Sequence, residues 1–251
     1  MNAYSEKESR LRILVISPVV SQELLKGYCE YFQGVADPTT EVEVVGVERG
    51  PTSIETFHDA VYAGPDILRL VREKSDAFDA IMINCFADPA VDAAREVTDK
   101  VVLGPAETSM SIALHLGSKF SVVSVLANTA PWVRLQARRF GIESRLASAI
   151  GIDIPVLSLE KDPKSTINEI VKAAKEAIQR DGAEVIILGC TGMVTLAQKI
   201  RERLCVPLVE PAAATLKMAE VLVKLGLRHN RGKLYLTPFP DRIRGYKRTI
   251  A

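Results

Sequence analysis

The sequence has few histidines, almost no net charge and no long apolar run. Its 251 residues include three histidines and one tryptophan, and 32 basic residues balance 31 acidic ones to a net charge of +1. Such a balance provides no overall field to attract a nucleic acid or an acidic membrane surface. No apolar stretch approaches the ~18 residues that span a bilayer, and residues 1–10 lack the apolar core of a signal peptide. We therefore expect a cytoplasmic protein that binds neither nucleic acid nor membrane.

Cysteine is also scarce, and its spacing disfavours a metal site. The four cysteines are Cys29, Cys85, Cys190 and Cys205; they form no C-x-x-C pair, and the histidines do not cluster with them. Zinc sites normally require clustered Cys and His ligands, so we predict no metal. A reducing compartment argues against disulfides. Cys29 and Cys205 lie in or at the end of expected helices, where a small buried apolar residue is the ordinary interpretation.

What the chain does contain is an internal repeat. An apolar run that ends in Asn84-Cys85 reappears in the second half as a run that ends in Gly189-Cys190. Each run reads as a buried strand, and each is followed by a helical stretch, a short apolar strand and another helix. A repeat of roughly a hundred residues is longer than a solenoid unit, so it indicates two similar domains that face each other.

Strands and helices alternate along the whole sequence. We expect strands at 11–17, 42–47, 80–84, 101–103, 120–126, 154–158, 184–189 and 206–209, and helices at about 21–34, 59–75, 89–98, 107–117, 130–140, 165–180, 193–204 and 211–226. This rhythm predicts an α/β fold with two pseudo-symmetric domains, each an open, mostly parallel sheet flanked by helices, and an active site in the cleft between them. We assign 1–10 to a flexible N-terminal segment, 11–105 plus 210–251 to the first domain, and 106–209 to the second.

The repeated cysteines lie where ligands bind in such folds. Open parallel sheets bind ligands beyond the carboxyl ends of their strands, and Cys85 and Cys190 each follow an expected strand. Each also precedes an expected helix N-terminus, which favours an anion and can lower a thiol pKa from about 8.5 toward neutrality. Asp88, followed by Pro89, is expected to cap that first helix. Two facing domains would carry the thiols to opposite walls of one cleft, which suits moving a proton on or off either face of a carbon.

At these residues the sequence resembles the aspartate/glutamate/hydantoin racemase superfamily, and most closely its hydantoin racemase branch. The resemblance covers residues 11 to about 226 and depends mainly on Cys85-Phe-Ala-Asp-Pro89 and Gly189-Cys-Thr-Gly-Met193. After the first strand, that branch usually has Asn-Pro-Asn-Thr-Ser, whereas this chain has Ser17-Pro-Val-Val-Ser21. Valines in place of polar residues make a pocket less polar and remove hydrogen-bonding groups, which leaves the substrate open.

The paired thiols and the resemblance both imply cofactor-independent 1,1-proton transfer. The resemblance further implies that the enzyme is a racemase, which inverts the stereocentre of a 5-substituted hydantoin or a related cyclic ureide. One cysteine, as thiolate, removes the proton, and the other, as thiol, returns one from the opposite face. We leave open which cysteine serves which face. The candidate donors to the enolate oxygen are the backbone N–H groups of Phe86, Ala87, Thr191 and Gly192. The candidate side-chain contacts are Ser17, Ser21, Ser124 and Thr191.

Other functions remain open at this point. Within the superfamily they are an allantoin racemase, an aspartate or glutamate racemase and a maleate isomerase-like enzyme; outside catalysis, a small-molecule sensor on the same scaffold remains. Amino-acid substrates need groups for an ammonium and for carboxylates, and no obvious basic residue lies directly beside the strand ends. We expect Trp132 at the core or rim of the second domain's cleft edge rather than stacked on the substrate. The resemblance implies a homo-oligomer. The basic stretch 227–251 is either a solvated tail or an arm that clasps another subunit.

Overall fold

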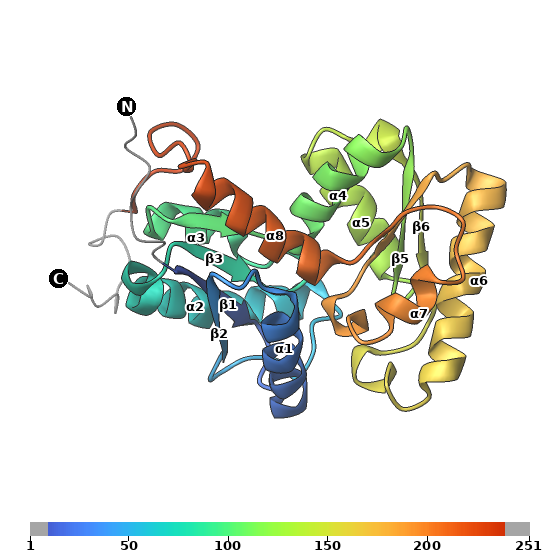
Figure 1. Ribbon diagram of the computed structural model, residues 1–251, viewed down its shortest axis with the longest axis horizontal. Coiled ribbons are helices and arrows are strands. Elements are labelled where there is room, and N and C mark those ends of the chain that lie inside the picture. Colours follow the sequence, from blue (N-terminus) through green and yellow to red (C-terminus); the bar gives the residue numbers. More distant parts are fainter. Residues whose placement is uncertain (1–9, 239–251) are drawn as a thin grey trace.

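The computed structural model, which describes residues 10–238, has two lobes of the same architecture (Figure 1). Each lobe contains one four-stranded parallel sheet, with the strand order β2-β1-β3-β4 in the first and β6-β5-β7-β8 in the second. The strand order of the first half therefore repeats in the second. This architecture confirms the predicted α/β fold with two pseudo-symmetric open sheets.

The elements follow the expected alternation. The first lobe contains β1 (Leu11–Ser17), α1 (Gln22–Val35), β2 (Thr40–Gly46), α2 (Phe57–Lys74), β3 (Ala80–Ile83), α3 (Val91–Val97) and β4 (Val101–Leu103). After α4 (Pro105–Leu116), the second contains β5 (Phe120–Ser124), α5 (Thr129–Arg139), β6 (Leu146–Gly151), the short 3₁₀ turn η3 (Val156–Ser158), α6 (Pro163–Asp181), β7 (Val185–Leu188), the turn η4 (Thr191–Met193), α7 (Ala197–Arg201) and β8 (Leu208–Val209). The last helix is α8 (Pro211–Lys224).

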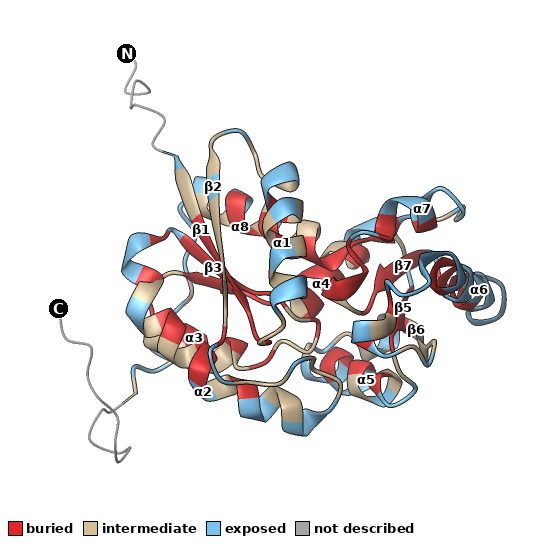
Figure 2. Cartoon of the chain, turned by 90° about the horizontal axis from the view of Figure 1, so that it is seen from below, coloured by how far each residue is buried: buried red, intermediate tan, exposed pale blue. Residues whose placement is uncertain are grey.

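The core of each lobe lies on both faces of its sheet. Every residue of β3 and β7 is buried, and the buried residues are concentrated along the strands and the inward faces of the helices (Figure 2). Strands that are covered on both faces read as continuous apolar runs. This is why the segments before Cys85 and Cys190 lack polar alternation.

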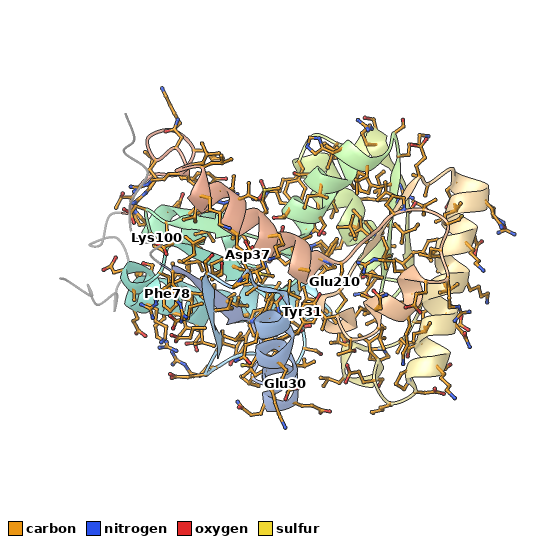
Figure 3. The ribbon with its side chains drawn as sticks, in the orientation of Figure 1. Glu30, Tyr31, Asp37, Phe78, Lys100 and Glu210 are labelled. Atoms are coloured by element: carbon orange, nitrogen blue, oxygen red, sulfur yellow. The ribbon has the colours of Figure 1, made fainter. Side chains whose placement is uncertain are left out.

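The two lobes exchange helices at their ends. α4, which follows the first sheet, packs on the second, where Met110 shares a core with Phe120. α8, which follows the second sheet, returns to the first, where Leu216 shares a core with Val15. Tyr31 of α1 donates a 2.5 Å hydrogen bond to Glu210 at the start of α8 (Figure 3). α4 thus covers the sheet whose strands follow it in the chain, and α8 covers the sheet of the first half of the chain.

The prediction of a strand at 154–158 is wrong. The strand that pairs with β5 is β6, and the later segment forms a turn with η3 instead. Pro155 has no N–H to donate to a ladder, whereas Ser148 pairs with Ser121 through an N–H···Oγ bond of 3.0 Å. Gly151 allows the close approach of the Leu126 carbonyl, because a Cβ at this position would lie 2.2 Å from that oxygen. The helix expected at 193–204 is likewise shorter and is reduced to η4 and α7.

The described part of the basic C-terminal stretch packs on the first lobe. The Val102 backbone N–H donates a 2.8 Å hydrogen bond to His229 Nε2, and Arg231 donates one of 2.9 Å to the Glu96 carbonyl. Residues 227–238 are therefore not a freely solvated tail, and 239–251 lie outside the described residues, as does the N-terminal segment apart from Arg10. No described helix has the length and apolarity required to cross a membrane.

Candidate active site

The site lies at the carboxyl ends of the central strands in both sheets. In each sheet the chain crosses from the first strand to one neighbour and then to the other, which creates a switch point where ligands bind in open α/β sheets. Cys85 follows β3 and Cys190 follows β7, each beside the end of the adjacent central strand at Ser17 or Ser124. Equivalent positions in the two lobes therefore carry the two thiols.

Both cysteines line one cavity of about 420 Å³ between the lobes. The other lining residues are Ile54, Phe86, Ala87, Ser124, Val125, Thr129, Trp132, Val133, Gln136, Gly189 and Thr191. None of these side chains is ionisable at neutral pH, so the cavity is an apolar chamber with a few hydroxyl and amide groups and two thiols.

Hydrogen bonds from the second lobe hold the Cys85 segment on both sides. Gln136 of α5 donates a 2.9 Å bond to the carbonyl of Phe86, directly after the cysteine. Thr191 of η4 donates a 3.3 Å bond to the carbonyl of Asn84, directly before it. Tyr28 of α1 lies 3.4 Å from the same Thr191 hydroxyl. Thr191, which follows Cys190, and Gln136 of α5 thus fix the segment that carries Cys85.

The connection between β2 and α2 also crosses the cleft. Its Glu55 accepts a 2.8 Å hydrogen bond from the Val156 backbone N–H through its carboxylate and another of 2.8 Å from Asn128 through its carbonyl. At the start of α2, the Phe57 ring lies 4.3 Å from the Trp132 ring, centroid to centroid. This segment closes the cavity on the side where Ile54 lines it.

The thiols do not have the lowered pKa that the sequence suggested. Burial raises the pKa of the Cys85 thiol far above its ordinary value. The nearby Cys190 and Asp88 raise this pKa further, whereas a hydrogen bond from the Ala87 backbone N–H lowers it. Burial likewise raises the pKa of Cys190 to about 11, although the Gly192 N–H donates to its Sγ at 3.3 Å. α3 begins only at Val91, and a 3₁₀ turn follows Cys190. Neither thiol therefore sits at an α-helix N-terminus.

Asp88 is a cap, but of a different helix than the sequence suggests. Its carboxylate accepts 2.9 Å hydrogen bonds from the backbone N–H groups of Ala106 and Glu107, which begin α4. Burial raises the pKa of Asp88 to about 7, opposed by these two donors. α3 instead begins after Ala90, which has a left-handed backbone. Glu107 forms a 2.6 Å ion pair with Arg95, outside the thiol cavity.

The structure brings together only part of the proposed contact set. Phe86, Ala87, Ser124 and Thr191 line the cavity with the two cysteines, whereas Ser17, Ser21 and Gly192 do not. Ser21 caps α1 through the Leu24 N–H at 3.4 Å, and Ser17 is fully buried. Gly192 lines a separate groove beside Tyr28. Neither valine of the Ser17–Ser21 loop reaches the cavity, so the unusual loop does not decide its polarity.

Sequence reasoning missed the wall that α5 and the β2–α2 connection supply. Ile54, Val125, Thr129, Val133 and Gln136 line the cavity, and no local motif marks them. The sequence of α5 does not indicate which side of the helix faces the cleft, because that depends on how the two lobes pack together. Trp132, expected at a core or rim position, is a half-buried lining residue.

Comparisons with known proteins agree with this site and fold. The family described as Asp/Glu/Hydantoin racemase matches residues 13–219. A hydantoin racemase of Paenarthrobacter aurescens is 35% identical over 91% of this chain and 98% of its own length; another, from Pseudomonas sp. (strain NS671), is 33% identical over 91% and 92%. The solved allantoin racemase of Pseudomonas fluorescens superimposes with a TM-score of 0.88 at 32% identity, covering 96% of this chain and all of that one.

The chain belongs to the Asp/Glu/hydantoin racemase family. The expectation of an isomerase of the racemase type is thereby confirmed, since curated relatives across nearly the whole chain are racemases.

Proposed function

We propose that this protein racemises a 5-substituted hydantoin by transferring a proton between Cys85 and Cys190 across carbon 5 of the ring. The observation that carries the proposal is the single cavity in which two thiols from equivalent strand ends meet without any other ionisable side chain. Relatives named for hydantoin and allantoin both act on such a ring, because allantoin is itself a hydantoin with a ureido substituent.

The proton transfer needs one thiolate and one thiol. The thiolate takes the proton from carbon 5, and the electron pair is delocalised into the adjacent carbonyl as an enolate. The second thiol then gives its proton to the opposite face of carbon 5, which leaves the charge on the other sulfur. In the reverse direction the two cysteines exchange roles.

Backbone donors near the thiols can stabilise the enolate oxygen. No hydrogen bond donated by the backbone N–H of Phe86 or Thr191 is found among the described residues, so these two groups are free to serve as donors. The N–H groups of Ala87 and Gly192 instead interact with the sulfurs of Cys85 and Cys190. Fixed donors of this kind stabilise charge that develops in a transition state.

The cavity favours a neutral ring over an amino acid. Aspartate and glutamate carry two carboxylates and an ammonium, and burying such charges without partners is costly. The lining offers no basic or acidic side chain to pair with them. Among the remaining substrates, the apolar wall of Ile54, Val125 and Val133 suits an apolar substituent better than the ureido group of allantoin.

The cysteine assignment is tested with single enantiomers of 5-substituted hydantoins, allantoin, aspartate and glutamate. We expect loss of optical rotation with a hydantoin for the wild type, and a decrease of at least about 10²-fold for Cys85→Ala and for Cys190→Ala, since positioned acid–base groups contribute about 10²–10⁴-fold. Cys205→Ala, at an exposed thiol, is the matched control and should keep the wild-type rate. A wild-type rate of racemisation in either Cys85→Ala or Cys190→Ala would contradict the proposal.

A further inference from the structure

A second cavity lies directly beside the one that contains the thiols. It has a volume of about 590 Å³ and shares three lining residues with the thiol cavity: Ala87, Trp132 and Gln136. Its other walls come from both lobes and are Phe57, Asp88, Val91, Asp92, Glu107, Leu135, Arg139 and Phe140. Because the two cavities have these residues in common, the shared side chains form a partition between them.

Trp132 is the large and adjustable part of this partition. Ala87 contributes a single methyl group, and Gln136 is buried and held by its hydrogen bond to the Phe86 carbonyl. Trp132 is half-buried, and no hydrogen bond of its indole is found among the described residues; it is held by the Phe57 ring at 4.3 Å. Phe57 lines only the second cavity. The indole therefore lies between the thiol cavity and the second cavity.

We propose that Trp132 sets the upper size of the substituent that the enzyme accepts at carbon 5, an inference that rests on the hydantoin assignment above. With the ring between the two thiols, a substituent that extends along the Val125 and Val133 wall meets the indole face. Small and medium apolar groups pack against it, whereas an aromatic group collides with it. Removing the indole joins the two cavities and gives a bulky substituent the space beyond.

The inference is tested by comparing kcat/KM for 5-benzylhydantoin and 5-methylhydantoin. Trp132→Ala should raise the benzyl-to-methyl ratio at least tenfold, within the range by which apolar pockets discriminate size, and Trp132→Phe should raise it less. Leu135→Ala is the control, because Leu135 lies on the same helix and lines only the second cavity; it should leave the ratio unchanged. An unchanged ratio in Trp132→Ala, with both substrates slowed together, would show that the indole only stabilises the fold.

Binding separates this inference from the proposed reaction. Calorimetric titrations of the two hydantoins into Cys85→Ala and into Cys85→Ala/Trp132→Ala measure the partition without turnover. Tighter binding of the benzyl compound in the double variant supports the role of Trp132 as a partition, whether or not a hydantoin is racemised. Absence of racemisation would overturn only the proposed reaction. Equal preference in both variants overturns the partition while leaving racemisation intact. Trp132 is the chain's one tryptophan, so its emission also reports whether 5-methylhydantoin reaches the indole.

Discussion

At the scale of single residues, the site depends on two thiols that are both protonated when the cavity is empty. Burial raises both pKa values, and more for Cys85 than for Cys190; nearby carboxylates, Asp88 beside Cys85 and Glu55 and Glu210 beside Cys190, raise them further. With a pKa of about 11, Cys190 remains almost entirely in its thiol form at pH 7. Cys190 is therefore the more readily ionised of the two thiols in the free enzyme, and the two sites titrate as an interacting pair.

This protonation state predicts the pH dependence of the reaction. A raised thiol pKa means that the thiolate is scarce below it and increases as the pH rises toward it. We therefore expect kcat/KM for a hydantoin to increase about tenfold per pH unit from about pH 6 to 10, after correction for the substrate's own ionisation. Initial rates from about pH 6 to 10 measure this profile, with Cys205→Ala as the control. A profile that is flat above neutrality would mean that a thiolate already exists in the free enzyme.

At the scale of elements, the two halves start their last helices by different means. Glu210 precedes α8 and accepts 2.7 Å hydrogen bonds from the Ala212 and Ala213 N–H groups. The equivalent position before α4 is Gly104, where an added Cβ would lie 2.4 Å from the Asp88 carboxyl carbon. Asp88 from the Cys85 loop therefore takes the place of the missing cap, and this ties the loop to α4.

Loss of this cap has a measurable cost. Asp88→Ala leaves the N–H groups of Ala106 and Glu107 without their acceptor, and we expect the free energy of unfolding to fall by about 1–2 kcal/mol, as for other N-cap losses. Asp88→Asn keeps one acceptor oxygen and should lose less. Denaturant unfolding followed by circular dichroism measures both variants. Equal stability of Asp88→Ala and wild type would rule out capping as the role of this carboxylate.

The same element shows what the sequence can and cannot predict. The buried runs before Cys85 and Cys190 identify the strands, their repeat identifies the paired thiols, and Asp88 is recognisable as a cap. Its partner is not, because α4 lies beyond an intervening helix and strand. The upward direction of the thiol pKa and the cleft-facing side of α5 are also tertiary properties, since they depend on how the second lobe covers the first. Pro155 was a local signal against the strand predicted at 154–158, but the apolar pattern of that segment outweighed it.

At the scale of the whole molecule, the site exists only where the two lobes meet. Each lobe contributes one thiol, and bonds from Thr191 and Gln136 of the second lobe position the segment around Cys85 of the first. The helix exchange through α4 and α8 couples the two sheets behind the cavity. In the proposed reaction, the pseudo-symmetry of the fold therefore places one cysteine sulfur on each face of the substrate.

The most direct test of this account is racemisation of one hydantoin enantiomer in heavy water, stopped early and corrected for spontaneous exchange. Two thiols on opposite faces predict that the newly formed enantiomer carries deuterium at carbon 5, because the second cysteine delivers a solvent-derived atom. They also predict that the remaining starting enantiomer stays largely protiated, since the base that removed its proton does not supply the product. Equal deuterium in both enantiomers at early times would indicate a single base and would contradict the two-cysteine mechanism.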